Sequence, residues 1–279
     1  MKKIYKNRVA IVLCLILFFW ILFSFLEIGL KDDIKEYDAI TVFFYTIAHS
    51  SFSLIQMIAP LFVMTLSTYK IHKEFHSGFI KYKLLRMDYK GYIKEKMVSL
   101  IKSTWILPTA ALFLFTLCYI LTKNFNFSKA IPQIIGYTSS GVPMYNGTIS
   151  VITEGFYAIP LQLMLTYFVV LFLHSIVYAN LAFIVCKNNK NFLVTLLESF
   201  LIYFAISIIS ELGLGTIAFK LLHLKFLSGV FNIVGIWIYC DYDNLWGVLI
   251  YSIILAVGSS IVAKITYRNK EKVLMACEK

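Results

Sequence analysis

The residues best suited to chemistry in this sequence are two histidines and two carboxylates in apolar surroundings. His72 and His76 stand four residues apart, so they share one face of a helix at a spacing that metal sites use. No third ligand stands nearby, and we expect both rings to lie near anionic lipid headgroups instead. Glu198 and Glu211 are thirteen residues apart, about 220° around a helix, so they do not form a carboxylate pair. The sequence therefore predicts no metal site and no catalytic acid–base pair.

The motifs of nucleotide and hydrolytic chemistry are absent. The sequence contains no GxxxxGK[ST] phosphate loop, no HExxH and no GxSxG. Its five cysteines form no CxxC pair, which argues against a zinc site or a disulfide framework. Gly213, Gly215 and Ala218 match the dinucleotide-binding spacing, but no strand is expected before them. We expect a chain that is not an enzyme and binds no cofactor itself.

The composition predicts an all-α integral membrane protein with one transmembrane domain over residues 1–279. Hydrophobic residues make up 59% of the 279 residues, whereas soluble domains have about 45–50%. Runs of about twenty apolar residues are long enough to cross the hydrocarbon core. Pro108 is expected to kink the third of these runs. The six predicted spans are 9–28, 47–68, 103–122, 159–185, 192–212 and 245–265.

The distribution of positive charge predicts the orientation of these spans. The net charge is +11, and most of the 26 Lys and Arg residues lie at the two termini, in the segment 69–102 and in the turn at 187–191. Because Lys and Arg accumulate on the cytoplasmic side, both termini are predicted to be cytoplasmic. The segments 123–158 and 213–243 then lie outside, the second as re-entrant or interfacial helices before the sixth span. The charge indicates orientation and needs no nucleic acid partner.

Polar residues recur along the second predicted span. His49, Ser53, Gln56 and Pro60 share one helical face, which cannot face lipid cheaply. This face either packs against another helix through hydrogen bonds or lines a translocation path. Glu198 and Glu211 are further candidates for such a path.

The segment 69–102 is the most basic part of the chain and is also amphipathic. A hydrophobic residue recurs every three or four positions, which predicts one apolar stripe along a basic helix. Asp88 is expected to cap a second helix that begins near Tyr89, with a turn at 86–88 between the two. The stripe consists of Ile71, Phe75, Phe79, Tyr82, Leu85 and Tyr89.

This segment resembles the cytoplasmic segment of the permease subunits of ABC-2 type exporters. Those subunits carry a pattern E-x-x-x-G-T-x-x-x-L-L, then a short turn, then Y-I-x-x-K leading into the third span. The corresponding residues here are Glu74, Gly78, Phe79, Leu84, Leu85, Arg86, Met87, Asp88, Tyr89, Tyr92, Ile93 and Lys96. The six spans and the broken apolar segment before the last one also resemble that family.

The resemblance implies that 69–102 is a coupling helix seated on a separately encoded ATPase. Glu74, Gly78, Leu84–Tyr89 and Lys96 would then couple this chain to the ATPase, which binds ATP and Mg²⁺. Two copies of the ATPase and a second permease subunit, identical or paralogous, would complete the transporter in a bacterial plasma membrane. Reversing the charges of Arg86 and Lys83 should then uncouple ATP hydrolysis from export. The implied substrate is amphipathic, such as an antimicrobial peptide or drug, in export, resistance or immunity.

Two other classes remain open. One is an autonomous membrane protein, either a secondary transporter or a bacteriocin immunity protein, which needs no ATPase. Secondary transporters usually have internal repeats and charged residues near the bilayer midplane, and neither is evident here. The other class is an intramembrane enzyme, which lacks its catalytic residues in this sequence.

Overall fold

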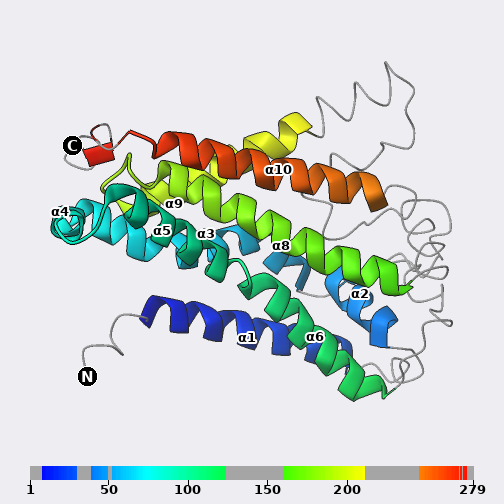
Figure 1. Cartoon of the computed structure of the whole chain (residues 1–279). Coiled ribbons are helices and arrows are strands. Elements are labelled where there is room, and N and C mark those ends of the chain that lie inside the picture. Colours follow the sequence, from blue (N-terminus) through cyan, green and yellow to red (C-terminus); the bar gives the residue numbers. More distant parts are fainter. Residues whose placement is uncertain are drawn as a thin grey trace. The chain divides into compact units, whose positions relative to one another are not determined.

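The computed structural model describes residues 8–29, 39–49, 52–123, 160–210, 245–269, 271, 273 and 274. All regular elements in these ranges are helices and none is a strand (Figure 1), which confirms the prediction of an all-α chain. The longer helices are α1 (Arg8–Gly29), α2 (Ala39–His49), α3 (Phe52–His76), α5 (Tyr89–Ser103), α6 (Ile106–Thr122), α8 (Pro160–Val185), α9 (Phe192–Ile208) and α10 (Leu245–Thr266). A short helix, α4 (Phe79–Leu84), lies between α3 and α5.

Three described helical stretches are long and apolar enough to cross a membrane: Tyr89–Thr122, Met164–Val185 and Gly247–Thr266. Two more, Ile11–Glu27 and Phe192–Ile208, are apolar but shorter. Large hydrophobic side chains are exposed on these helices, as on α10, and lipid is the solvent that such a surface suits. The structure thus supports a membrane protein, and five of the predicted spans coincide with helices.

The second predicted span differs from the structure. A single span over 47–68 was expected, but α2 is a separate helix that begins at Ala39, and α3 continues eight residues beyond Thr68 to His76. The apolar sequence of α2 follows directly on the acidic loop, and α3 continues because its last two turns bury Ile71 and Phe75. Hydrophobicity alone located the apolar centre of this region and missed both helix boundaries.

Pro108 interrupts the helix at the residue four positions before it, Thr104. The helix breaks at Thr104 and Trp105, and Pro108 then lies in the first turn of α6. In a continuous helix the amide of residue 108 would donate to the carbonyl of Thr104, and proline has no such donor. The amide of Thr104 donates to the Ile101 carbonyl over 3.2 Å, so α5 ends in a tighter turn. The expected kink is therefore a break between α5 and α6, ahead of the proline.

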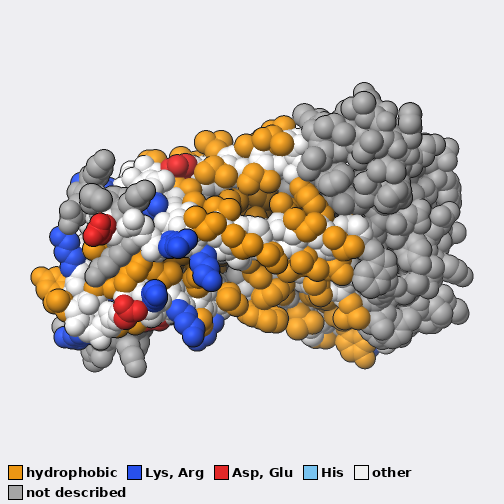
Figure 2. Space-filling view, turned by 45° about the horizontal axis from the view of Figure 1, so that its top comes forward, with side chains coloured by type: hydrophobic (Ala, Val, Ile, Leu, Met, Phe, Trp, Pro, Cys, Tyr) orange, Lys and Arg blue, Asp and Glu red, His pale blue; other side chains and the backbone are white. Residues whose placement is uncertain are grey.

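The chain divides into two compact units. Unit 1 contains residues 1–57, 108–171 and 207–251, and unit 2 contains residues 58–107, 172–206 and 252–279. The rings of unit 1 pack around Phe43, whose centroid lies 5.7 Å from that of Phe115 and 5.8 Å from that of Tyr167. Most of the described charged residues belong to unit 2. Hydrophobic side chains cover much of the described surface in Figure 2.

Unit 2 has an aromatic core with polar contacts between its helices. The rings of Phe183 and Tyr267 stack at 4.1 Å, and Phe75 lies 5.8 Å from Tyr267. Asn180 of α8 donates to the hydroxyl oxygens of Ser259 and Ser260 of α10 over 3.1 and 2.9 Å. Interhelical hydrogen bonds of this kind join helices in an apolar medium, where few other partners exist.

The predicted outer segments 123–158 and 213–243 lie outside the described residues, apart from Lys123.

Candidate functional site

The helices α3, α4 and α5 follow one another in the sequence and are separated by two turns. Gly78 has φ 71°, in the left-handed region that favours glycine, and it separates α3 from α4. Asp88 caps α5 as predicted, because its carboxylate accepts a hydrogen bond from the amide of Lys90 over 3.3 Å. A short α4 is thus held between two longer helices at defined turns.

The predicted apolar stripe does not lie on one helix. Gly78 reorients the chain after α3, so the six hydrophobic residues divide into two groups. Ile71, Phe75 and Tyr89 are buried in unit 2, whereas Phe79 and Tyr82 of α4 and Leu85 after it point outward. Ile80, on the other side of α4, is buried. We call this exposed group the apolar tip: Phe79 is 48% exposed, Tyr82 69% and Leu85 84%.

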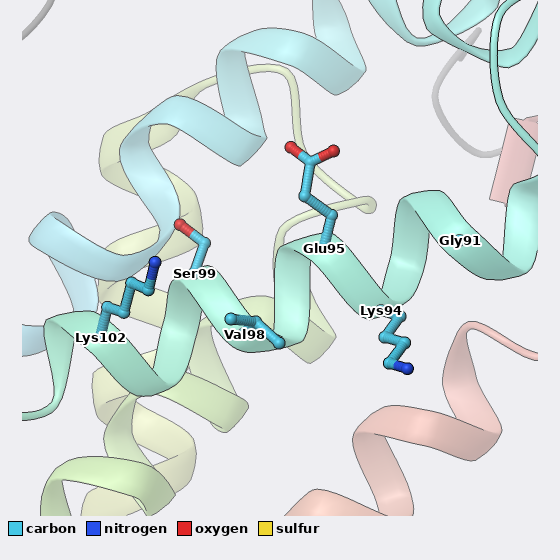
Figure 3. Close-up of a pocket in the computed structure, with 6 residues that line it drawn as sticks. All are labelled: Gly91, Lys94, Glu95, Val98, Ser99 and Lys102. Atoms are coloured by element: carbon cyan, nitrogen blue, oxygen red, sulfur yellow. The ribbon is translucent and has the colours of Figure 1, made fainter.

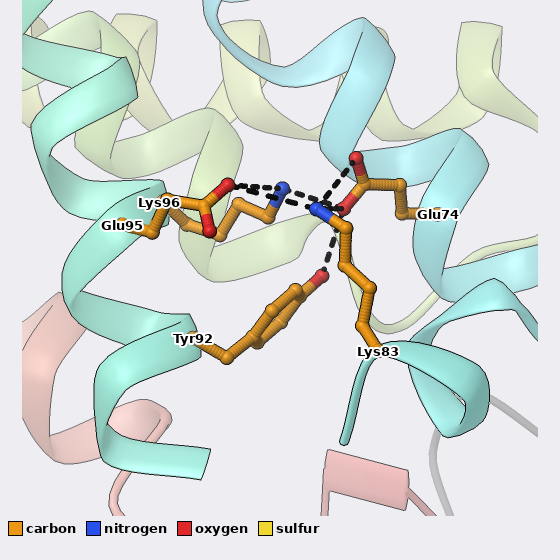
Figure 4. A network of polar contacts seen from close by, with 5 residues as sticks. All are labelled: Glu74, Lys83, Tyr92, Glu95 and Lys96. Atoms are coloured by element: carbon orange, nitrogen blue, oxygen red, sulfur yellow. Dashed lines mark hydrogen bonds and ion pairs between the residues drawn. The ribbon is translucent and has the colours of Figure 1, made fainter. Parts of the chain in front are cut away.

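Beside the apolar tip, charged side chains are turned inward. We call this group the ion cluster (Figure 4): Glu74, Lys83, Tyr92, Glu95 and Lys96. The Lys96 ammonium lies 2.5 Å from the Glu74 carboxylate, and both residues are buried. Lys83 of α4 lies 3.4 Å from the same carboxylate, which also accepts a hydrogen bond from the Tyr92 hydroxyl over 3.2 Å. One carboxylate of α3 therefore binds side chains from both α4 and α5.

The second carboxylate balances the charge of the ion cluster. Glu95 lies 3.6 Å from the Lys83 ammonium and 3.8 Å from that of Lys96. Two carboxylates thus face two ammonium groups. Lys96 also lies over the ring of Tyr92, with its nitrogen 5.0 Å from the ring centroid. Because buried ions are stable only when paired and hydrogen-bonded, the cluster fixes the relative positions of α3, α4 and α5.

The ionised pair is the state of the ion cluster near neutral pH. Burial raises the pKa of the Glu74 carboxyl, but the hydrogen bond and charge of Lys96, with the charge of Lys83, outweigh it and hold that pKa below its usual value. The close contact between the Lys96 ammonium and the Glu74 carboxylate stabilises the charged form of both groups.

Two further contacts fix the same helices within unit 2. The Nε2 atoms of His72 and His76 lie 2.8 and 3.0 Å from the carbonyl oxygens of Asn189 and Cys186. Each ring must carry its proton on Nε2 to bind a carbonyl, so α3 is joined to the turn between α8 and α9. Burial lowers the pKa of His72, against a raising effect of this hydrogen bond. The interpretation as headgroup-facing residues is wrong for His72, which is 6% exposed.

The hydroxyl of Tyr89 supplies the second contact. It donates to the carbonyl oxygen of Tyr267 over 3.0 Å, and the Tyr267 hydroxyl donates to the carbonyl oxygen of Phe183 over 2.5 Å. The beginning of α5 is thereby joined to the residue after α10 and to α8. The coupling residues inferred from the resemblance thus divide into buried supports and surface groups.

The surface groups among the inferred coupling residues lie at the end of α4 and in the turn after it. Leu85, Arg86 and Asp88 are exposed, and Met87 and Leu84 are half-buried. Glu74, Tyr89 and Lys96 are the buried supports. The charge reversal at Arg86 and Lys83 would therefore combine two effects, because Lys83 pairs with Glu74 inside the ion cluster.

The residues predicted to line a translocation path are placed only in part. His49 ends α2, whereas Ser53, Gln56 and Pro60 belong to α3, so they are not on one helix as predicted. Pro60 is buried, and the side chains of the other three lie outside the described part. Glu198 of α9 is half-buried and accepts a hydrogen bond from the Asn189 amide over 2.5 Å. Glu211 lies outside the described residues.

Sequence reasoning named four residues of the ion cluster but missed Glu95 and the pairing between them. Tyr92 and Lys96 are four residues apart in α5, which gives a helical spacing, but Lys83 and Glu95 follow no pattern that links them to Glu74. Tyr267 carries no signal, because its role depends on α10 ending beside α5 and α8. Within the described ranges no three His, Cys, Asp or Glu residues lie close enough to hold a metal ion.

Compared with known protein families, curated proteins and solved structures, the chain matches none.

Proposed function

We propose that the chain is the membrane-spanning permease subunit of an ABC-2 type transporter, with the apolar tip as its contact for a separate ATPase subunit. The observation that carries this proposal is the combination of an exposed apolar tip with a buried ion cluster beside it. Exposed hydrophobic patches on soluble-facing parts of a protein mark binding surfaces. A tip of this size on a short helix suits a groove or cleft on a partner.

The ion cluster supports a mechanical role for this contact. A force applied to α4 reaches α3 through Lys83 and Glu74, and α5 through Lys83 and Glu95. The Lys96 pair and the Tyr89 hydrogen bond then carry it to the rest of unit 2. Because such contacts hold the three helices together, displacement of the tip moves all of them. ATP hydrolysis on the partner would drive this displacement.

The remaining parts of the proposal follow from the predicted topology. Six spans with both termini in the cytoplasm would place the tip on the cytoplasmic side of a bacterial plasma membrane. Two permease subunits and two ATPases would export an amphipathic substrate such as an antimicrobial peptide or drug. The residues predicted to line the translocation path remain His49, Ser53, Gln56, Pro60, Glu198 and Glu211.

Co-purification tests the proposal. The full-length chain is purified from its host in mild detergent, and the ATPase activity of the eluate is measured. We expect activity with the wild type, and its loss in a variant carrying Leu85→Asp and Arg86→Glu. Lys190→Glu, an exposed reversal in the turn between α8 and α9, serves as the control and should retain the activity. An eluate without ATPase activity from wild-type membranes, or equal activity in all three, would contradict the proposal.

A further inference from the structure

The surface of α5 has a hollow of about 500 Å³ that no proposed contact with an ATPase uses. Its lining residues come from one helix and combine two cations, one hydroxyl and a missing side chain (Figure 3). They are Gly91, Lys94, Glu95, Val98, Ser99 and Lys102.

The charges around this hollow are unbalanced. Lys94 and Lys102 are exposed and form no ion pair within the described part of the chain. The one carboxylate at the hollow belongs to Glu95, which lies within 4 Å of Lys83 and Lys96 in the ion cluster. Figure 3 shows the Glu95 side chain directed away from that of Lys94. The hollow is therefore complementary to an anion.

The exposed residues along α5 become more apolar across this hollow. Lys90 lies before it and Lys94 and Val98 line it, and Ile101 and Trp105 continue on the same side, with Lys102 between them. Val98, Ile101 and Trp105 are 46, 49 and 56% exposed. These apolar residues lead into α6 within a candidate membrane span, Tyr89–Thr122. Such a transition, with a tryptophan beside it, is the pattern of a membrane–water interface. A lysine at this level keeps its ammonium among the headgroups.

We propose that this hollow binds the phosphate headgroup of an anionic phospholipid. Lys94 and Lys102, two helical turns apart, would bind the phosphodiester oxygens from either side, and the Ser99 hydroxyl can donate to the same group. The acyl chains would lie along Val98, Ile101 and Trp105. Gly91 leaves room for the headgroup, because a Cβ there would meet nothing closer than the Met87 Cε at 3.9 Å. Packing therefore does not require a glycine at this position.

Trp105 offers a natural probe for the test. In a full-length variant with Trp20, Trp237 and Trp246 replaced by phenylalanine, its fluorescence is quenched by brominated lipids in vesicles. Mixtures of brominated phosphatidylglycerol and phosphatidylcholine give the relative affinity of the lipid site beside Trp105. We expect a clear preference for phosphatidylglycerol. The double variant K94Q/K102Q should reduce it by about fivefold per lysine. In native mass spectrometry, the wild-type chain without tryptophan replacements should retain phosphatidylglycerol in preference to phosphatidylcholine.

Two further variants separate a shaped site from surface charge. G91L places a side chain in the hollow without changing any charge and should also reduce the preference. K190Q/K264Q removes two exposed lysines of unit 2 elsewhere and should leave it intact. Lack of a preference in the wild type would overturn the proposal, as would equal loss in K190Q/K264Q or no loss in K94Q/K102Q. Competition by inorganic phosphate would overturn it as well, since the site would then take a free anion.

Discussion

The apolar tip and the ion cluster lie within one short segment and distribute their side chains in opposite ways. Leu85 is 84% exposed although it is hydrophobic, and Lys96 is 2% exposed although it is charged. A segment folded only for stability would bury the leucine and expose the lysine. In the ion cluster, pairing of the charges offsets the free-energy cost of burying them. At the apolar tip, nothing in the described structure offsets the free-energy cost of exposing hydrophobic side chains. We therefore assign stability to the cluster and binding to the tip.

The largest effect on stability should come from breaking the ion cluster. Lys96→Met leaves the Glu74 carboxylate buried with only Lys83 and Tyr92, which should cost about 3–5 kcal/mol of unfolding free energy. Chemical denaturation of the full chain in detergent measures this. Glu95→Gln, at a carboxylate that is half exposed, should cost less than about 1 kcal/mol. A double variant with Glu74→Gln should recover part of the loss, and full additivity would show that the pair does not interact.

The acid stability of the chain should depend on Glu74. Its pKa in the folded protein is below the unfolded value, so the unfolded state binds the proton more readily. The stabilisation is therefore fully present above about pH 4.3 and is lost as the pH falls through the folded pKa. Thermal midpoints of the wild type should drop in this range, and those of Glu74→Gln should drop less. Parallel pH profiles would exclude Glu74 as the titrating group.

A smaller effect is expected at Gly78, which sets the direction of α4. Gly78→Ala should cost about 1–2 kcal/mol, since an L-residue is strained in the left-handed region. A Cβ at this glycine meets no atom within 4 Å, so the loss would come from the backbone alone. Gly91→Ala is the matched control within α5 and should stabilise the chain by about 0.5–1 kcal/mol. Equal effects at the two glycines would mean that α4 does not depend on this turn.

The smallest effect on stability should occur at the apolar tip. Leu85→Ala and Tyr82→Ala remove exposed side chains and should change the unfolding free energy by less than about 0.5 kcal/mol. Both should nevertheless lower the ATPase activity that co-purifies with the chain. A stability loss comparable to that of Lys96→Met would show that the tip is part of the fold.

The sequence predicted the helical class and the capping of α5 by Asp88 because both depend on local patterns. It failed where contacts between distant residues decide the structure. The apolar stripe looked continuous, since periodicity does not show that Gly78 adopts a left-handed conformation. Glu74 was identified through its family-like spacing, but its partner Lys83 lies on another helix and follows no period. Tyr267 could not be predicted for the same reason.

What the apolar tip contacts in native membranes decides whether it binds an ATPase. A photocrosslinking amino acid placed at position 85 in the full-length chain, irradiated in native membranes, tests this contact. We predict an adduct whose attached protein contains a phosphate loop and is retained on immobilised ATP. A matched probe at position 190, also exposed in unit 2, should give no such adduct. Adducts from position 85 only to lipid, to proteins without a phosphate loop, or to none would contradict the assignment of the tip to an ATPase.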